Sequence, residues 1–126
     1  MDGLGPMARD RTKLKVFHLA NQLAVIVYRT TRVFPIAERD VRSQLRRAAL
    51  SVPSNIAEGA ARRSRGDYLR FLDIALGSAS EADYLLDFCL EVDLLGKPAH
   101  GDCRNCAQQV VRALQKLIEA VEQFES

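Results

Sequence analysis

Residues 44–59 read QLRRAALSVPSNIAEG, and this stretch decides how the rest of the chain is arranged. Its apolar positions keep helical spacing on both sides of Pro53, although a proline removes one backbone donor and clashes with the carbonyl four residues earlier. Ser51, Ser54 and Asn55 carry polar groups that can bond to the backbone at a kink. The pattern favours one kinked helix, with two helices separated just before the proline as the alternative.

Working outward from this stretch, apolar residues spaced three and four apart predict four helices with short connections. The predicted helices span residues 12–31, 36–61, 64 to about 95, and 102–124. Thr12, Ser64 and Asp102 are the expected N-caps, and Gly96 with Pro98 ends the third helix. The expected fold is all-α, an antiparallel four-helix bundle with a proline-kinked second helix, formed by residues 12–126 after a flexible N-terminal tail at residues 1–11.

The first predicted helix has an unusually wide apolar surface. Between Leu19 and Tyr28 only Asn21 and Gln22 are polar. A surface that wide needs burial on more than one side, which suggests both a monomer core and a partner subunit.

Length and composition indicate a single soluble domain. The chain has 126 residues, of which 48% are hydrophobic and 27% charged. No window resembles a transmembrane span, so no membrane partner is expected, and the first ten residues lack an apolar signal core. We therefore expect a cytoplasmic protein.

Charge is divided unevenly along the chain. Residues 1–66 contain 13 Lys and Arg against 5 Asp and Glu, whereas residues 67–126 contain 5 against 11, so +8 and −6 give the net charge of +2. Such asymmetry favours an anionic partner, nucleic acid first. Basic and acidic helices that complement each other within a bundle or between subunits are an equally good explanation.

Two segments resemble a known bacterial family. Residues 34–64, FPIAERDVRSQLRRAALSVPSNIAEGAARRS, and residues 68–86, YLRFLDIALGSASEADYLL, carry its motifs in order. These motifs are FP-x-x-E, S-Q-L-R-R-A, S-V-P-x-N-I-A-E-G and R-F-L-x-I-A-x-G-S. The chain resembles the four-helix-bundle family of proteins encoded in intervening sequences of 23S rRNA, over about half its length, whereas the segment with Cys103 and Cys106 lies outside the pattern.

The resemblance implies a four-helix bundle that assembles as a homopentamer and has no established enzymatic activity. The chain is also similar to the accessory proteins of diversity-generating retroelements. These are basic pentamers that bind nucleic acid and a reverse transcriptase, so RNA or DNA and such a protein become expected partners.

Arginines form the strongest candidate for a functional surface. Three of them, Arg39, Arg42 and Arg46, share one face of the second predicted helix. The guanidinium group binds phosphate through two parallel hydrogen bonds. The candidate nucleic-acid-binding set is Arg39, Arg42, Arg46, Arg47, Arg62, Arg63 and Arg65. The alternatives are a solvated helix face or salt bridges to Asp83, Asp87 and Glu91.

The remaining motif residues suit structural roles. Asn55 and Glu58 have no neighbouring nucleophile, so no catalytic set, enzyme activity or cofactor is expected. Glu58 is placed to pair with Arg62 four residues later. The structural motif comprises Pro53, Asn55, Glu58, Gly59 and Gly77, and Gly77 suggests close approach of a neighbouring helix.

Cysteines offer a weaker third class of function. Cys103 and Cys106, with His100 upstream, could form half of a zinc site or a redox pair. A second ligand pair is missing from the sequence, and Cys89 suits the core of the third helix. We therefore assign no metal site.

Overall fold

The computed structural model describes residues 5–124, and side chains within residues 13–123. All secondary structure in the described part is helical, which confirms the all-α prediction. The helices are α1 (Gly5–Thr30), α2 (Arg39–Ala60), α3 (Arg65–Glu91) and α4 (Lys97–Phe124). The 3₁₀ turns η1 (Thr31–Val33) and η2 (Ile36–Glu38) connect α1 to α2.

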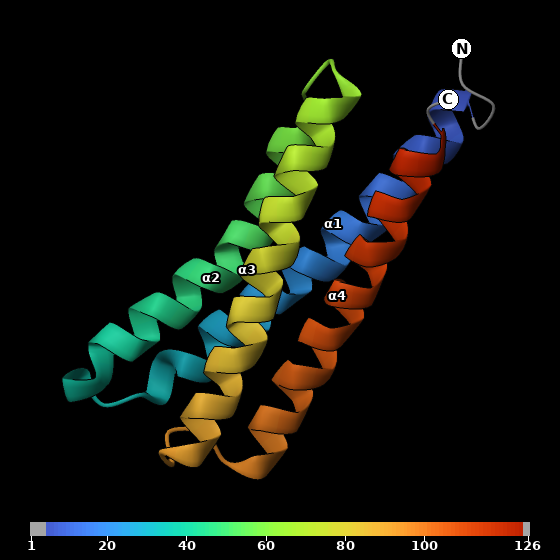
Figure 1. The fold of residues 1–126 in the computed structure, drawn as a ribbon. Helices are drawn as coiled ribbons and strands as arrows, with labels where there is room; N and C mark the ends of the chain where they lie inside the picture. The colour runs from blue at the N-terminus through green and yellow to red at the C-terminus, as the bar shows by residue number, and fades with distance from the viewer. Residues whose placement is uncertain (1–4, 125–126) are drawn as a thin grey trace.

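The helices run up and down in sequence order (Figure 1). Each packs against its sequence neighbours, and α1 also packs against α4, which closes the ring. Short connections force consecutive helices to be antiparallel. The prediction of an antiparallel four-helix bundle is therefore confirmed.

Pro53 lies inside α2, which continues through it as one helix. Figure 1 shows the axis of α2 changing direction along its length. The Asn55 side-chain amide donates to the Ser51 carbonyl at 2.8 Å and to the Ser51 hydroxyl at 2.9 Å. That hydroxyl is 2.8 Å from the Ser78 hydroxyl on α3. Asn55 therefore bonds the backbone of the turn that contains the proline, and Ser51 links this turn to α3.

The core is built from one apolar stripe on each helix. In α2, Leu45, Val52 and Ile56 are fully buried on both sides of the proline. In α4 the buried stripe is Ala107, Val110, Leu114 and Leu117. In α1 the buried stripe is Val16, Ala20, Leu23 and Val27.

Close helix approach occurs at Gly59 rather than at Gly77. A Cβ atom at Gly59 would lie 2.8 Å from the Phe71 Cβ and 3.2 Å from the Tyr68 Cδ1. Gly77 is exposed, and nothing lies within 4 Å of the place where its Cβ would be. The prediction for Gly77 was therefore wrong, because Gly77 lies on the exposed side of α3.

Three predicted helix boundaries also need correction. Helix α1 begins at Gly5, so Thr12 lies inside it and is not an N-cap, while residues 1–4 of the predicted tail lie outside the described part. Helix α3 ends at Glu91, where Asp93 takes a left-handed φ of 64°. Helix α4 begins at Lys97, so Asp102 does not cap it. Ser64 does cap α3, accepting from the Asp67 backbone N–H at 3.0 Å.

Candidate nucleic-acid interface

The candidate arginines divide between the two ends of α2. At 1.5 Å per residue, Arg42 and the helix end near Arg62 are about 30 Å apart along α2. Arg39, Arg42 and Arg46 follow one side of the N-terminal half, as the sequence predicted. Arg62, Arg63 and Arg65 lie at the junction of α2 and α3, so the set does not form one continuous surface.

Arg46 is held against the end of α1 by three contacts. Its Nε donates to the Thr31 Oγ1 at 2.8 Å, and its Nη2 donates to the Tyr28 carbonyl at 3.0 Å. Its guanidinium carbon lies 3.8 Å from the centroid of the Tyr28 ring. A cation at a helix C-terminus also interacts favourably with the helix dipole. Arg46 therefore joins α2 to α1, and these contacts fix the position of its guanidinium group.

Two further arginines, Arg29 of α1 and Arg32 of η1, lie next in sequence to the residues of this joint. Arg29 follows Tyr28 in sequence, Arg32 follows Thr31, and both are exposed. Sequence reasoning missed them because the periodicity of one helix does not show which residues of another lie beside it. The short connection at residues 31–38 could have revealed them, because it makes the first two helices antiparallel and brings the end of one beside the start of the other. We call this cluster the α1–α2 corner; it comprises Tyr28, Arg29, Arg32, Arg39, Arg42 and Arg46.

The corner has little acidic charge to neutralise it. Arg39 makes one weak contact, from Nη1 to the Ile36 carbonyl at 3.5 Å. Among the side chains that the structure describes, Arg29, Arg32 and Arg42 form no ion pair. Glu38 and Asp40 are the carboxylates nearest in sequence, and neither forms an ion pair with these arginines in the described part of the chain. The corner can therefore offer several guanidinium groups to an anion.

Two of the three arginines at the far end of α2, Arg62 and Arg65, are engaged within the chain, whereas Arg63 is exposed. Arg62 donates from Nη2 to the Glu58 Oε2 at 2.8 Å, the pair expected from sequence, and its guanidinium lies 4.8 Å from the Phe71 ring centroid. Arg65 donates from Nη1 to the carbonyls of Val121 and Glu122 at 3.5 and 3.3 Å. These carbonyls lie in the last turn of α4, so Arg65 bonds the end of that helix.

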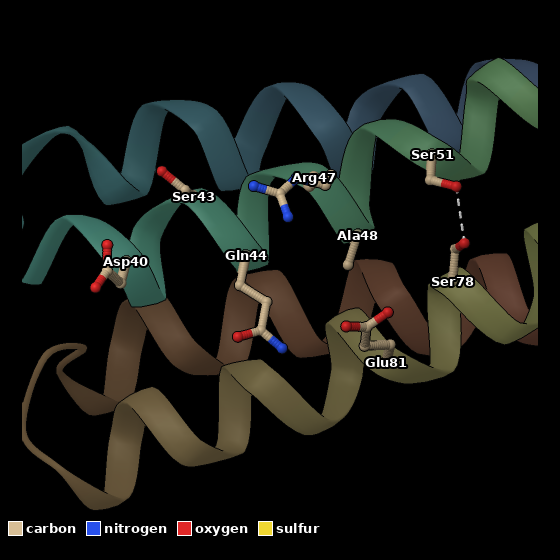
Figure 2. Close-up of a pocket in the computed structure, with 8 residues that line it drawn as sticks. All are labelled: Asp40, Ser43, Gln44, Arg47, Ala48, Ser51, Ser78 and Glu81. Atoms are coloured by element: carbon tan, nitrogen blue, oxygen red, sulfur yellow. Dashed lines mark hydrogen bonds between the residues drawn. The ribbon is translucent and has the colours of Figure 1, made fainter.

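Arg47 lies on a different side of α2 from Arg46. It lines an open groove between α2 and α3, of about 600 Å³. Figure 2 shows Arg47 with Asp40 on the same helix and with Glu81 on α3. Two carboxylates beside one guanidinium give the groove a net negative charge, which opposes phosphate binding.

Acidic residues of α3 pair with α4 rather than with the candidate arginines. The Asp87 Oδ1 accepts from the His100 Nε2–H at 2.7 Å. Arg104 Nε lies 3.4 Å from the Asp83 Oδ1 and 3.6 Å from the Asp87 Oδ1. Arg104 therefore forms ion pairs with both carboxylates. Its Nε–H does not point at the Asp83 oxygen closely enough to form a hydrogen bond. The alternative of salt bridges to Asp83 and Asp87 therefore does not hold within the chain.

The cysteines occupy apolar surroundings. Burial raises the pKa of the Cys89 thiol to about 11, and burial also raises the pKa of Cys103 and Cys106. Cys103 is fully buried, with its Sγ 3.6 Å from the Thr30 Oγ1 on α1. Raised pKa values keep these groups as thiols, whereas nucleophiles and metal ligands are thiolates. Cys103 packs against α1 as part of the hydrophobic core.

The described residues 5–124 contain neither a cluster of metal-ligating side chains nor a membrane-spanning helix. Within them, no group of three His, Cys, Asp or Glu side chains is placed to hold a metal ion. No helix in the same part of the chain is long and apolar enough to cross a membrane.

Comparison with known proteins supports the resemblance seen in the motifs. The family model described as 23S rRNA-intervening sequence protein matches residues 12–116. A similar solved structure is a protein of unknown function from the S23 ribosomal protein family of Bacteroides thetaiotaomicron VPI-5482, with a TM-score of 0.80 and 21% sequence identity. The match covers 86% of this chain and 98% of that chain. At this identity the likeness shows the fold alone, and the comparison with curated proteins found no match.

Proposed function

The chain belongs to the 23S rRNA-intervening sequence protein family, and from this premise we propose that it is a non-enzymatic, homo-oligomeric scaffold that binds RNA or DNA through the α1–α2 corner. The family assignment leaves the biochemical activity open. The proposal therefore rests on the chemistry of the corner.

The observation that carries the proposal is a group of arginines without carboxylate partners. Among the described side chains, Arg29, Arg32 and Arg42 form no ion pair, and Arg39 makes only a weak backbone contact. Guanidinium groups suit phosphate oxygens, and phosphate contacts supply affinity that does not depend on sequence. A corner with this charge fits a nucleic-acid backbone better than it fits a neutral ligand.

Exposed apolar side chains support the oligomeric part of the proposal. On α3, Ile74, Tyr84 and Phe88 share an outward face and are 42%, 64% and 37% exposed. On α1, Leu14 and Val25 remain 54% and 38% exposed, in keeping with the wide apolar surface seen in the sequence. A homopentamer, the state implied by family resemblance, would repeat the corner around a ring and raise its avidity.

The assembly is tested by measuring its mass in solution. We expect the native mass to be a multiple of the 14.0 kDa chain, five being the proposed number. Phe88→Glu places a charge on the outward face of α3 and should shift the protein toward smaller species. A wild-type chain that is monomeric at micromolar concentration contradicts the oligomeric scaffold.

A second candidate is a protein-interaction scaffold that does not bind nucleic acid. Exposed carboxylates on α3, namely Asp73, Glu81 and Glu91, could pair with the corner arginines of another subunit. The mixed charges of the Arg47 groove also suit a protein partner, such as the reverse transcriptase implied by the resemblance.

Salt-dependent binding separates the two candidates. Labelled mixed-sequence RNA is titrated with the protein at several salt concentrations, and the affinity should fall steeply because each phosphate contact contributes a slope of about 0.7 to 0.9. The double variant Arg39→Ala/Arg42→Ala should bind more weakly and with a slope smaller by about 1 to 2. Arg62→Ala/Arg63→Ala is the matched control with the same loss of charge. If both double variants lose the same affinity for RNA, the binding site is not the α1–α2 corner. If the wild type does not bind RNA at low salt, the proposal of nucleic-acid binding is wrong.

A further inference from the structure

Tyr28 occupies an unusual position within the α1–α2 corner. Its side chain is 52% exposed, although the Arg46 guanidinium lies 3.8 Å from the ring centroid. One face of the ring is therefore covered by a cation. The remaining exposure belongs to the other face and the edge of the ring.

The covering guanidinium is fixed in place. Arg46 donates to the Thr31 hydroxyl at 2.8 Å and to the Tyr28 carbonyl at 3.0 Å. Thr31 is itself 1% exposed, and its hydroxyl donates to the Val27 carbonyl at 2.8 Å. The Tyr28 ring is thus supported from behind by a chain of bonds that ends in the core.

Four further arginines lie on the segments that meet at Tyr28. Arg29 and Arg32 come from α1 and η1, while Arg39 and Arg42 come from the start of α2. Proteins that bind single-stranded nucleic acid combine basic grooves with aromatic rings on which bases stack. The bases of a duplex are already stacked on one another and cannot reach such a ring.

We propose that Tyr28 is a stacking platform for an unpaired base, so that the α1–α2 corner prefers single-stranded nucleic acid to duplex. This proposal rests on the proposed function and names the class of nucleic acid that the corner takes. The four outer arginines bind phosphates on either side of the stacked base. Arg46 is a positioning residue, which holds the ring and does not contact the ligand.

A tryptophan at position 28 reports directly on stacking. The chain has no tryptophan, so Tyr28→Trp introduces a single indole. Adding a single-stranded mixed-sequence RNA should quench its emission, whereas the same sequence in a duplex should leave it nearly unchanged. Tyr84→Trp, at a position 64% exposed on α3, is the matched control and should respond to neither. Equal quenching at both positions, or a blue-shifted emission of Trp at position 28 that shows it covered by another subunit, overturns the proposal.

Affinity measurements complete the test. Tyr28→Leu removes the ring and should weaken binding of single-stranded RNA by about five- to a hundredfold, with little effect on duplex. Tyr28→Phe keeps the ring and should bind like the wild type, which also shows that the position tolerates change. Arg42→Ala should weaken binding of both forms. If Arg42→Ala weakens binding and Tyr28→Leu does not, the stacking platform is wrong and the phosphate-binding corner stands; if the wild type binds neither form, both are wrong.

Discussion

At the N-terminal end of α2, Arg46 reaches across to α1, whereas near its C-terminal end Gly59 lets α3 approach closely. The first contact is polar and uses two hydrogen bonds and a ring. The second is apolar, because the Gly59 backbone faces Phe71 and Tyr68 without a side chain between them. One helix therefore joins its two neighbours by different means, with Pro53 between the two joints.

The arginines at the two ends differ in the same way. At the α1–α2 corner, Arg46 is fixed while Arg39 and Arg42 remain available to a ligand. At the far end, Arg62 pairs with Glu58 and Arg65 bonds the end of α4. Similar arginine density in the sequence thus has different consequences, which depend on the neighbouring helix. Four sets of substitutions test this difference between the two ends of α2.

The largest effect is expected at the apolar joint. Gly59→Ala places a Cβ 2.8 Å from the Phe71 Cβ, and the helices must separate to admit it. We expect a loss of about 1–3 kcal/mol in the free energy of unfolding, measured with denaturant. Gly77→Ala meets nothing within 4 Å and should leave stability unchanged or raise it by about 1 kcal/mol. Equal effects of the two substitutions would contradict the close approach at Gly59.

The polar joint should respond somewhat less. Arg46→Ala removes both bonds to the end of α1 and the contact with Tyr28. We expect a loss of about 1–2 kcal/mol in unfolding free energy, with Arg46→Lys intermediate because it keeps the charge without the planar fork. Arg42→Ala is the control, since it removes the same charge one turn away. If Arg42→Ala destabilises the protein as much as Arg46→Ala, the joint has no special role.

A smaller effect is expected between the two joints, at the proline. Asn55→Ala removes bonds to the carbonyl and hydroxyl of Ser51. Unfolding free energy should fall by about 1 kcal/mol. Ser54→Ala, at the exposed neighbouring position, should change it by less than about 0.5 kcal/mol. An Asn55→Ala variant as stable as the wild type would show that the bend needs no side-chain support.

The smallest effect is expected from the exposed ion pair at the far end. Arg62 and Glu58 have side chains 40% and 52% exposed, so solvent screens their attraction. A double-mutant cycle with Arg62→Ala and Glu58→Ala should give a coupling of about 0.3–0.5 kcal/mol, which added salt reduces. A coupling well above 1 kcal/mol would mean that the Arg62–Glu58 pair stabilises the protein as much as the Arg46 contacts at the corner.

Much of the fold could be predicted from local patterns. Helical spacing through Pro53 identified α2 as one helix, and Ser64 and Glu58 had recognisable partners a few residues away. The boundaries around residues 91–97 were missed because Asp93 takes a left-handed conformation usually associated with glycine. Pro98 was interpreted as a stop, although proline suits the first turn of a helix, as it does here in α4.

The candidate site depended on packing that no local pattern contains. Sequence spacing grouped Arg39, Arg42 and Arg46 correctly on one side of a helix. Only the antiparallel crossing of α1 and α2 brings Tyr28 beneath Arg46 and places Arg29 nearby. The error at Gly77 has the same origin. A glycine in a helix allows close contact with a neighbouring helix, but the sequence does not show whether such a contact is made.

The bend in α2 also has a consequence for motion. Pro53 has no N–H, so the Ala49 carbonyl lacks its usual partner and the turn around it is held by one bond fewer. Hydrogen exchange should therefore report faster local opening at the amides of residues 50–52, 54 and 55 than at residues 75–80 of α3. Because the two halves of α2 are attached to different neighbours, such opening at the proline would let the α1–α2 corner shift while the joint at Gly59 stays closed.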